Sequence, residues 1–142
     1  MEDFVHLHVH TQYSLLDGQA AINKLVDKAR ANGMRGMAVT DHGDMMGIKE
    51  FFDYCNKVNK PVKSAIKVLE KKLASVTDDE KTSLEEQIEE QKKKIFIPIF
   101  GCEMYCARRR LQDKDKDHKE DSSGWHLIVL AKNEKGYHNL IK

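Results

Sequence analysis

The sequence predicts an α/β fold built on a mainly parallel sheet or barrel. Segments of strand length, either apolar or alternating, recur along the chain, and segments with apolar residues at helical spacing separate the first three of them. The resulting order, β-α-β-α-β-β, is typical of α/β folds. The chain has 142 residues, of which 40% are hydrophobic, and this is enough to form the core of one domain.

The first predicted strand covers residues 5–10, where histidines alternate with apolar residues. His6, His8 and His10 therefore share one face of that strand. Alternate Cα atoms of a strand lie about 6.6 Å apart, so two of these imidazoles can bind the same metal ion. An apolar stripe over residues 21–29 predicts the first helix, and Asn32-Gly33 is a suitable end for it.

The remaining elements follow from the same patterns. Residues 36–40 are apolar on both faces, which is typical of a buried parallel strand. A second helix is predicted from about residue 48 to 58, with Pro61 just beyond its end and with buried Phe51, Phe52, Cys55 and Val58. Residues 95–105 and 125–131 are the third and fourth predicted strands.

Two charged segments interrupt this order. Residues 63–94 contain eight basic and eight acidic residues, with thin apolar stripes and a possible capping box at 77–80. They predict an inserted helical hairpin, either a solvated spacer or an arm that binds a partner. Residues 108–123 are rich in charge and predict a mobile surface loop.

Composition excludes several classes of protein. The net charge of +1 gives no global argument for binding nucleic acid or a membrane. No apolar stretch approaches the roughly 18–20 residues of a membrane span, and the N-terminus lacks the features of a secretory signal. The three cysteines form no CxxC pair, so we expect reduced thiols in a cytoplasmic protein.

Residues of metal-ligand type gather at four strand ends. They are His8 and His10 with the nearby Asp17, then Asp41 and His42, then Glu103, and finally His126. Each one alone has an ordinary explanation as a core, turn or surface residue. Together they offer imidazoles and carboxylates, a mixture that binds Zn²⁺, Mn²⁺ or Fe²⁺ and supports hydrolysis of phosphate esters.

Four motifs resemble the successive motifs of the polymerase and histidinol phosphatase (PHP) superfamily. They are His8-Val9-His10-Thr11, Thr40-Asp41-His42-Gly43, Gly101-Cys102-Glu103 and Trp125-His126-Leu127. Residues 4–18 and 130–140 resemble the PHP domains of bacterial replicative DNA polymerases, the polymerase III alpha subunits. The resemblance covers nearly the whole chain except residues 63–94.

The resemblance implies a distorted (β/α)₇ barrel of the TIM type with up to three divalent metal ions, either Zn, Mn or Fe. The implied ligands are His8, His10, Asp17, His42, Glu103 and His126. Glu103 would bridge two ions, while His6 and Asp41 would lie behind the ligands. Arg108–Arg110 match no metal motif, and contact with phosphate is a separate hypothesis for these residues.

The resemblance also implies a function. Residues 1–142 would be the N-terminal part of one PHP domain in a DNA-directed DNA polymerase, with DNA and other holoenzyme subunits as partners. The PHP domain would be a metal-dependent phosphoesterase, for example a 3′–5′ proofreading exonuclease. The alternatives are a free-standing phosphatase acting on a small phosphate monoester and a non-catalytic scaffold of the polymerase.

The family pattern continues beyond residue 142 with a Cys or His and then an Asp-x-His pair. We therefore expect the domain to be incomplete here, with fewer bound ions or none. A partial barrel also has two unpaired sheet edges, which predict a homodimer or a domain swap.

Overall fold

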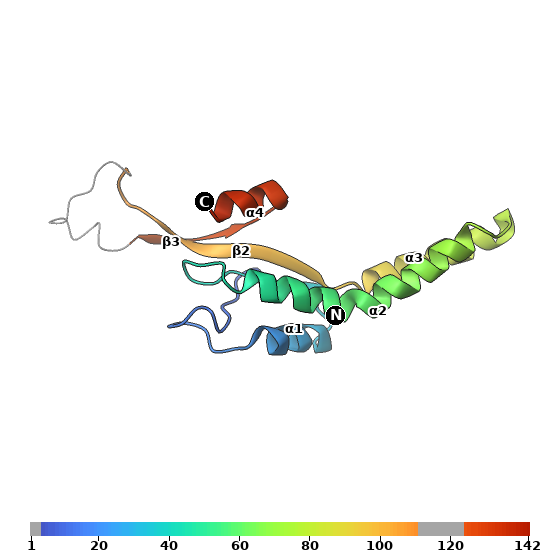
Figure 1. Cartoon of the computed structure of the whole chain (residues 1–142), viewed down its shortest axis with the longest axis horizontal. Coiled ribbons are helices and arrows are strands. Elements are labelled where there is room, and N and C mark those ends of the chain that lie inside the picture. The colour runs from blue at the N-terminus through green and yellow to red at the C-terminus, as the bar shows by residue number, and fades with distance from the viewer. Residues whose placement is uncertain (1–3, 111–123) are drawn as a thin grey trace.

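The computed structural model describes residues 4–110 and 124–142. Figure 1 shows a small mixed α/β body from which a long helical hairpin projects. In chain order the elements are α1 (Ile22–Ala31), β1 (Gly36–Val39), α2 (Ile48–Leu73), α3 (Asp78–Lys93), β2 (Ile97–Cys106), β3 (Trp125–Leu130) and α4 (Glu134–Leu140). The α/β class is confirmed, whereas most of the loop predicted at 108–123 lies outside the described residues.

The three strands form a sheet in the order β1-β2-β3. The first half of β2 pairs with β1 in parallel, from Gly36 opposite Ile97 to Val39 opposite Phe100. Its second half pairs with β3 in antiparallel register, beginning with Gly101 opposite Leu130. The prediction of a mainly parallel sheet therefore holds for β1 and β2 but is wrong for the last strand, because β3 pairs with β2 in antiparallel register.

The histidine-rich segment at the start of the chain is not a regular strand. It runs along the outer edge of β1, with one parallel bridge between His6 and Met37 and a bend at Leu7. The amide of Ala38 donates to the carbonyl of His6 at 2.8 Å, and the amide of Thr40 donates to that of Val9 at 2.9 Å. The prediction of a strand is therefore wrong, because the bend at Leu7 interrupts the ladder.

The core lies between α1, α2 and the sheet, and Tyr137 of α4 packs against this core and against Phe100 of β2 (Figure 1). Its fully buried members include Ile22 and Val26 of α1, Val39 of β1, and Phe51 of α2. The helical periodicity predicted the positions in α1 and α2, and the apolar run at 36–40 predicted Val39. Phe52 is an exception, because 46% of its surface is exposed. Two cysteines are buried and one is exposed, and all three are free.

The predicted end of the second helix near residue 58 is wrong, because α2 continues through Pro61 to Leu73. Proline at 61 removes one backbone donor, but neighbouring contacts stabilise the helix on both sides of it. Buried Asn59 exchanges two hydrogen bonds with the backbone of Phe96, at 2.8 and 2.9 Å. Ile66 of α2 and Ile88 of α3 are also buried.

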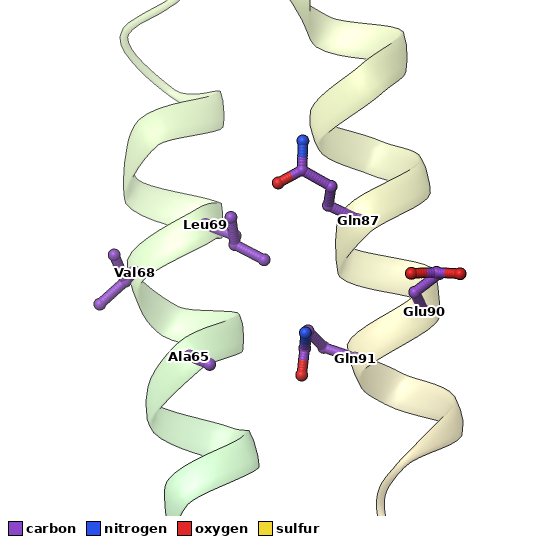
Figure 2. A pocket seen from close by; sticks show the side chains of 6 residues that line it. All are labelled: Ala65, Val68, Leu69, Gln87, Glu90 and Gln91. Atoms are coloured by element: carbon purple, nitrogen blue, oxygen red, sulfur yellow. The ribbon is translucent and has the colours of Figure 1, made fainter.

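The hairpin predicted at 63–94 is present, with the outer part of α2 as its first helix and α3 as its second. The predicted capping box does not form, because Thr77, the N-cap residue of α3, makes no side-chain hydrogen bond to the start of the helix. In Figure 2, Ala65 and Leu69 of α2 lie opposite Gln87 and Gln91 of α3, whereas Val68 points away. The apolar seam of this arm is therefore thin. Within the described ranges, no helix is both long and apolar enough to cross a membrane.

Candidate metal centre

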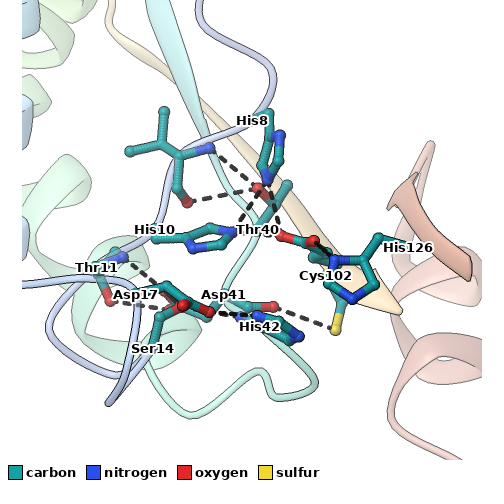
Figure 3. Close-up of polar contacts among 12 residues, drawn as sticks. His8, His10, Thr11, Ser14, Asp17, Thr40, Asp41, His42, Cys102 and His126 are labelled. Atoms are coloured by element: carbon teal, nitrogen blue, oxygen red, sulfur yellow. Dashed lines mark hydrogen bonds and ion pairs between the residues drawn. The ribbon is translucent and has the colours of Figure 1, made fainter. Parts of the chain in front are cut away.

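The candidate site is centred on Glu103, a residue of β2 that is only 5% exposed. Figure 3 shows the histidines that gather at this site, His8, His10, His42 and His126. Its Oε2 atom lies 2.9 Å from Nε2 of His8 and 2.5 Å from Nε2 of His10. Its other oxygen, Oε1, lies 2.6 Å from Nδ1 of His126 on β3. The antiparallel pairing of β2 with β3 and the extended segment beside β1 bring these three histidines to one carboxylate.

Among the described residues, two groups can each hold a metal ion. The first is His8, His10 and Glu103, and the second is His42, Glu103 and His126. Within each group the ligand atoms lie within 4.8 Å of one another. Glu103 belongs to both groups, as expected of a carboxylate that bridges two ions.

Asp17 lies outside both groups, and its Oδ2 atom contacts Nδ1 of His42. The side chain of Asp17 is 42% exposed. In this arrangement the carboxylate orients the imidazole and leaves the other ring nitrogen of His42 for a ligand role. The structure thus brings all six predicted ligand residues into one cluster, five of them in the two groups around Glu103.

The Glu103 carboxylate is held in its charged form. Burial on its own raises the pKa of this group, but hydrogen bonds with His8, His10 and His126 outweigh burial and lower the pKa to about 2. The group is therefore ionised at neutral pH. An ionised carboxylate with both oxygens directed at imidazoles matches the donor set of Zn²⁺, Mn²⁺ and Fe²⁺.

One nitrogen of the cluster lacks a hydrogen-bond partner. Nε2 of His42 is buried and, within the described part of the chain, no polar atom satisfies it. A buried polar atom without a partner costs free energy, so such atoms are rare in folded proteins. A metal ion would satisfy this nitrogen, and the residues present therefore fit a bound divalent cation.

Asp41 lies outside both groups and is joined to the residues around them by hydrogen bonds. Its Oδ1 atom accepts hydrogen bonds from the amide of Thr11 at 2.6 Å and from Oγ of Ser14 at 2.9 Å, and Oδ2 accepts from Oγ1 of Thr11 at 2.9 Å. The carbonyl of Asp41 accepts from the amide of Glu103 at 3.0 Å. Asp41, which is 1% exposed, thus ties the loop after His10 to the strand that presents Glu103.

Sequence reasoning missed several residues of the site. Thr11, Ser14 and Thr40 are buried hydroxyl residues whose hydrogen bonds join the histidine segment to the end of β1. Their occurrence within a few residues of the His and Asp motifs was the available signal. The ring of Tyr105 lies 5.0 Å from the rings of both His42 and His126, and the sequence offered no signal for this contact.

His6 and Arg108 lie outside both groups. The exposed ring of His6 packs edge-on against Phe4, with 4.8 Å between ring centroids. The guanidinium of Arg108 lies over the ring of Trp125 at 4.8 Å. These are contacts with neighbouring aromatic rings, so neither residue takes part in the arrangement around Glu103.

Comparison with models of protein families identifies the family of this chain. The model of the PHP domain family matches residues 6–142, so the chain belongs to the PHP domain family. PHP domains are generally metal-dependent, in agreement with the two His and Glu groups around Glu103.

The individual proteins that the chain resembles include several DNA polymerase III alpha subunits. The chain is 36% identical over 138 residues to a DNA polymerase III subunit alpha from Treponema pallidum and 35% identical over 139 residues to one from Borreliella burgdorferi. A Helicobacter pylori protein of the same name is 33% identical over 138 residues. These alignments cover 97–98% of the chain but only 8–9% of each relative. The chain therefore corresponds to a small part of such polymerases.

Proposed function

We propose that this chain is the metal-binding N-terminal part of a PHP domain that hydrolyses phosphate esters within a replicative DNA polymerase. The observation that best supports the proposal is the position of Glu103, whose two oxygens face different histidines in two groups of ligand type. A carboxylate shared in this way is typical of sites that hold two metal ions for phosphoester hydrolysis.

In this proposal His8, His10, His42, Glu103 and His126 hold the ions, while Asp17 orients the ring of His42. A bound divalent cation would polarise a phosphoryl oxygen and make a water molecule acidic enough to react near neutral pH. The chain's own residues contribute charge and position: Glu103 is ionised, and Asp41 holds the loop after His10 against β1 and β2.

The wider proposal concerns the protein that contains this chain. Residues 1–142 form the first part of a distorted (β/α)₇ barrel with up to three ions, and later residues complete it. The whole protein synthesises DNA in the cytoplasm together with other polymerase subunits, and its PHP domain acts as a 3′–5′ exonuclease. The similarity to polymerase III alpha subunits supports this proposal.

The test compares the complete PHP domain with a variant that carries His8→Ala and His10→Ala. We expect the variant to lose at least one equivalent of bound metal, measured by elemental analysis, and to lose hydrolysis of a 3′-terminal phosphodiester. His138→Ala is the control, because His138 lies on α4 and is 58% exposed. It should leave both properties unchanged.

Two outcomes would favour the alternatives. The His8→Ala/His10→Ala variant and the native protein could have equal metal content and equal nuclease activity. This result would contradict the catalytic proposal and favour a non-catalytic scaffold of the polymerase. Metal-dependent hydrolysis of small phosphate monoesters, without any action on DNA ends, would favour a phosphatase instead.

A further inference from the structure

The helical arm formed by α2 and α3 has no role in the metal centre, and its charges are unevenly distributed. Residues 54–69 of α2 contain four lysines and no acidic residue. Residues 82–91 of α3 contain four glutamates and no basic residue. A solvated spacer needs no such separation, because mixed charges on each helix would keep it equally soluble.

The lysines of α2 form a row along one face. Lys57, Lys60, Lys67 and Lys71 follow one another at intervals of three, seven and four residues, which keeps them on one side of a helix with 3.6 residues per turn. The row spans 14 residues, or about 21 Å of helix. We refer to these four residues as the lysine row.

The lysine row is available to a partner. All four side chains are exposed. Among the described residues, none of the four forms an ion pair with a carboxylate, and Lys57 alone has another charge-related contact, over the ring of Tyr54 at 5.8 Å. Glu70 is the single acidic residue in 54–73. Burial and internal pairing therefore do not account for the row.

The lysine row extends along α2 from the body of the molecule toward the tip of the arm. It begins at Lys57, which lines a groove near the start of α2 together with Tyr13, Met46, Lys49, Glu50, Asp53 and Tyr54. The two carboxylates of this groove already have partners, because Glu50 accepts from the hydroxyl of Tyr13 and Asp53 pairs with Lys49. Tyr13 lies two residues from Thr11, the residue hydrogen-bonded to Asp41 behind Glu103. From there the row follows α2 outward along the projecting arm (Figure 1). It thus connects the vicinity of the candidate site to the arm.

We propose that the lysine row binds the phosphate backbone of a nucleic acid and guides it toward the metal centre. A straight series of unpaired ammonium groups matches a regular series of phosphates, and lysine binds phosphate as a point charge. Because the row carries no side chains suited to reading bases, binding is independent of sequence. The choice of nucleic acid, rather than another polyanion, rests on the proposed function.

The test measures DNA binding by the 142-residue chain, using fluorescence anisotropy with a labelled 20-nucleotide single strand and the matching duplex. EDTA is present throughout, so the result does not depend on metal binding or hydrolysis. The test variant carries Lys60→Gln, Lys67→Gln and Lys71→Gln. The matched control, which removes the same charge from exposed positions elsewhere, carries Lys24→Gln, Lys28→Gln and Lys132→Gln.

We expect the row variant to bind the single strand at least about tenfold more weakly at 50 mM salt, with the slope of log K against log salt reduced by about 2 units. The control should change the slope by less than about half a unit. The stronger of the two native affinities, for single strand or duplex, identifies the form of the substrate. Circular dichroism should show equal helix content in all three proteins.

Four results would overturn the proposal. The first is equal affinity and equal salt slope for the row variant and the control, and the second is no binding by the native chain at 50 mM salt. The third is displacement of DNA by polyglutamate at equal charge concentration, which would assign the row to an acidic protein. The fourth is salt-sensitive self-association that the row variant abolishes, which would assign the row to the glutamate-rich α3 of a second copy.

Discussion

At the scale of single residues, the site contains two buried carboxylates, Asp41 and Glu103, that differ in the groups around them and therefore in their roles. Asp41 is surrounded by neutral donors, the amide and hydroxyl of Thr11 and the hydroxyl of Ser14, which satisfy both of its oxygens. Glu103 is surrounded by imidazoles, which are groups able to bind a metal ion together with it. The first carboxylate therefore stabilises the loop, while the second is suited to bind a cation.

This difference predicts different effects of mutation. Asp41→Asn replaces an accepting oxygen with a donor and leaves a buried donor of Thr11 or Ser14 unpaired, so we expect a loss of about 1–3 kcal/mol in the free energy of unfolding. Urea denaturation in EDTA measures this loss without any contribution from metal.

The control for that experiment is Asp17→Asn. Asp17 is 42% exposed, so its removal should cost less than about 1 kcal/mol in EDTA. Because Asp17 orients His42, the same variant should bind metal about 10–100-fold more weakly in a titration. Equal stability losses in the two variants would show that Asp41 has no special structural role.

At the scale of elements, α2 is notable because it continues through a proline. The helix is stabilised by tertiary contacts on both sides of Pro61: Asn59 bonds to the backbone of Phe96, and Ile66 is buried in the arm. Proline therefore disfavours a helix at this point, and the packing of α2 against α3 and β2 outweighs this unfavourable local propensity.

From this conflict we predict that Pro61→Ala stabilises the protein. Alanine restores the backbone donor at position 61 and removes the clash of the proline ring, whose cost in a helix interior is about 3 kcal/mol. Because α2 already accommodates the ring, we expect a gain of about 1–3 kcal/mol in the free energy of urea unfolding. Ser64→Ala, at an exposed position of the same helix, should change it by less than about 0.5 kcal/mol. An unchanged or lower stability of Pro61→Ala would contradict this account.

At the scale of the whole molecule, the two edges of the sheet differ. The edge of β1 is partly covered, because the segment around His6 and Val9 accepts hydrogen bonds from the amides of Ala38 and Thr40. In the described part of the chain, β3 pairs with β2 on one side only, and its residues Trp125 and Leu127 are 63% and 53% exposed. An uncovered edge with exposed apolar residues favours pairing with another chain.

We therefore expect this chain to self-associate at micromolar concentration through β3, as a dimer or a domain swap. Leu127→Lys adds a charge to the edge strand and should shift the sedimentation coefficient toward that of a monomer. Leu16→Lys is the control, because Leu16 is 98% exposed on a loop outside the sheet. A monodisperse native monomer would contradict the expectation.

Local patterns in the sequence were sufficient for several parts of this structure. Apolar stripes predicted α1 and the buried side of α2, and Gly33, with φ of 78°, takes the left-handed conformation expected after α1. The apolar run at 36–39 predicted β1. These features depend on residues close to one another in the chain, which is why spacing alone reveals them.

The candidate ligands were predicted partly from residue types and partly from the family resemblance. His8 and His10 were identified by their spacing, but the roles of Asp17 and Glu103 came from the motifs. The sequence could not show that Glu103 belongs to both groups, nor that Thr11 and Ser14 satisfy Asp41. These contacts join residues 27 to 95 positions apart, so no local pattern records them.

The sequence by itself thus determined the α/β class, the helices of the body and the kinds of ligand present. Only the tertiary structure decided that the histidine segment bends at Leu7, that α2 continues past Pro61, and that β3 returns antiparallel to bring His126 to Glu103. The physical reason is the same in each case. Hydrogen bonds and buried side chains between distant segments outweigh local propensity, and their partners become known only when the chain is folded.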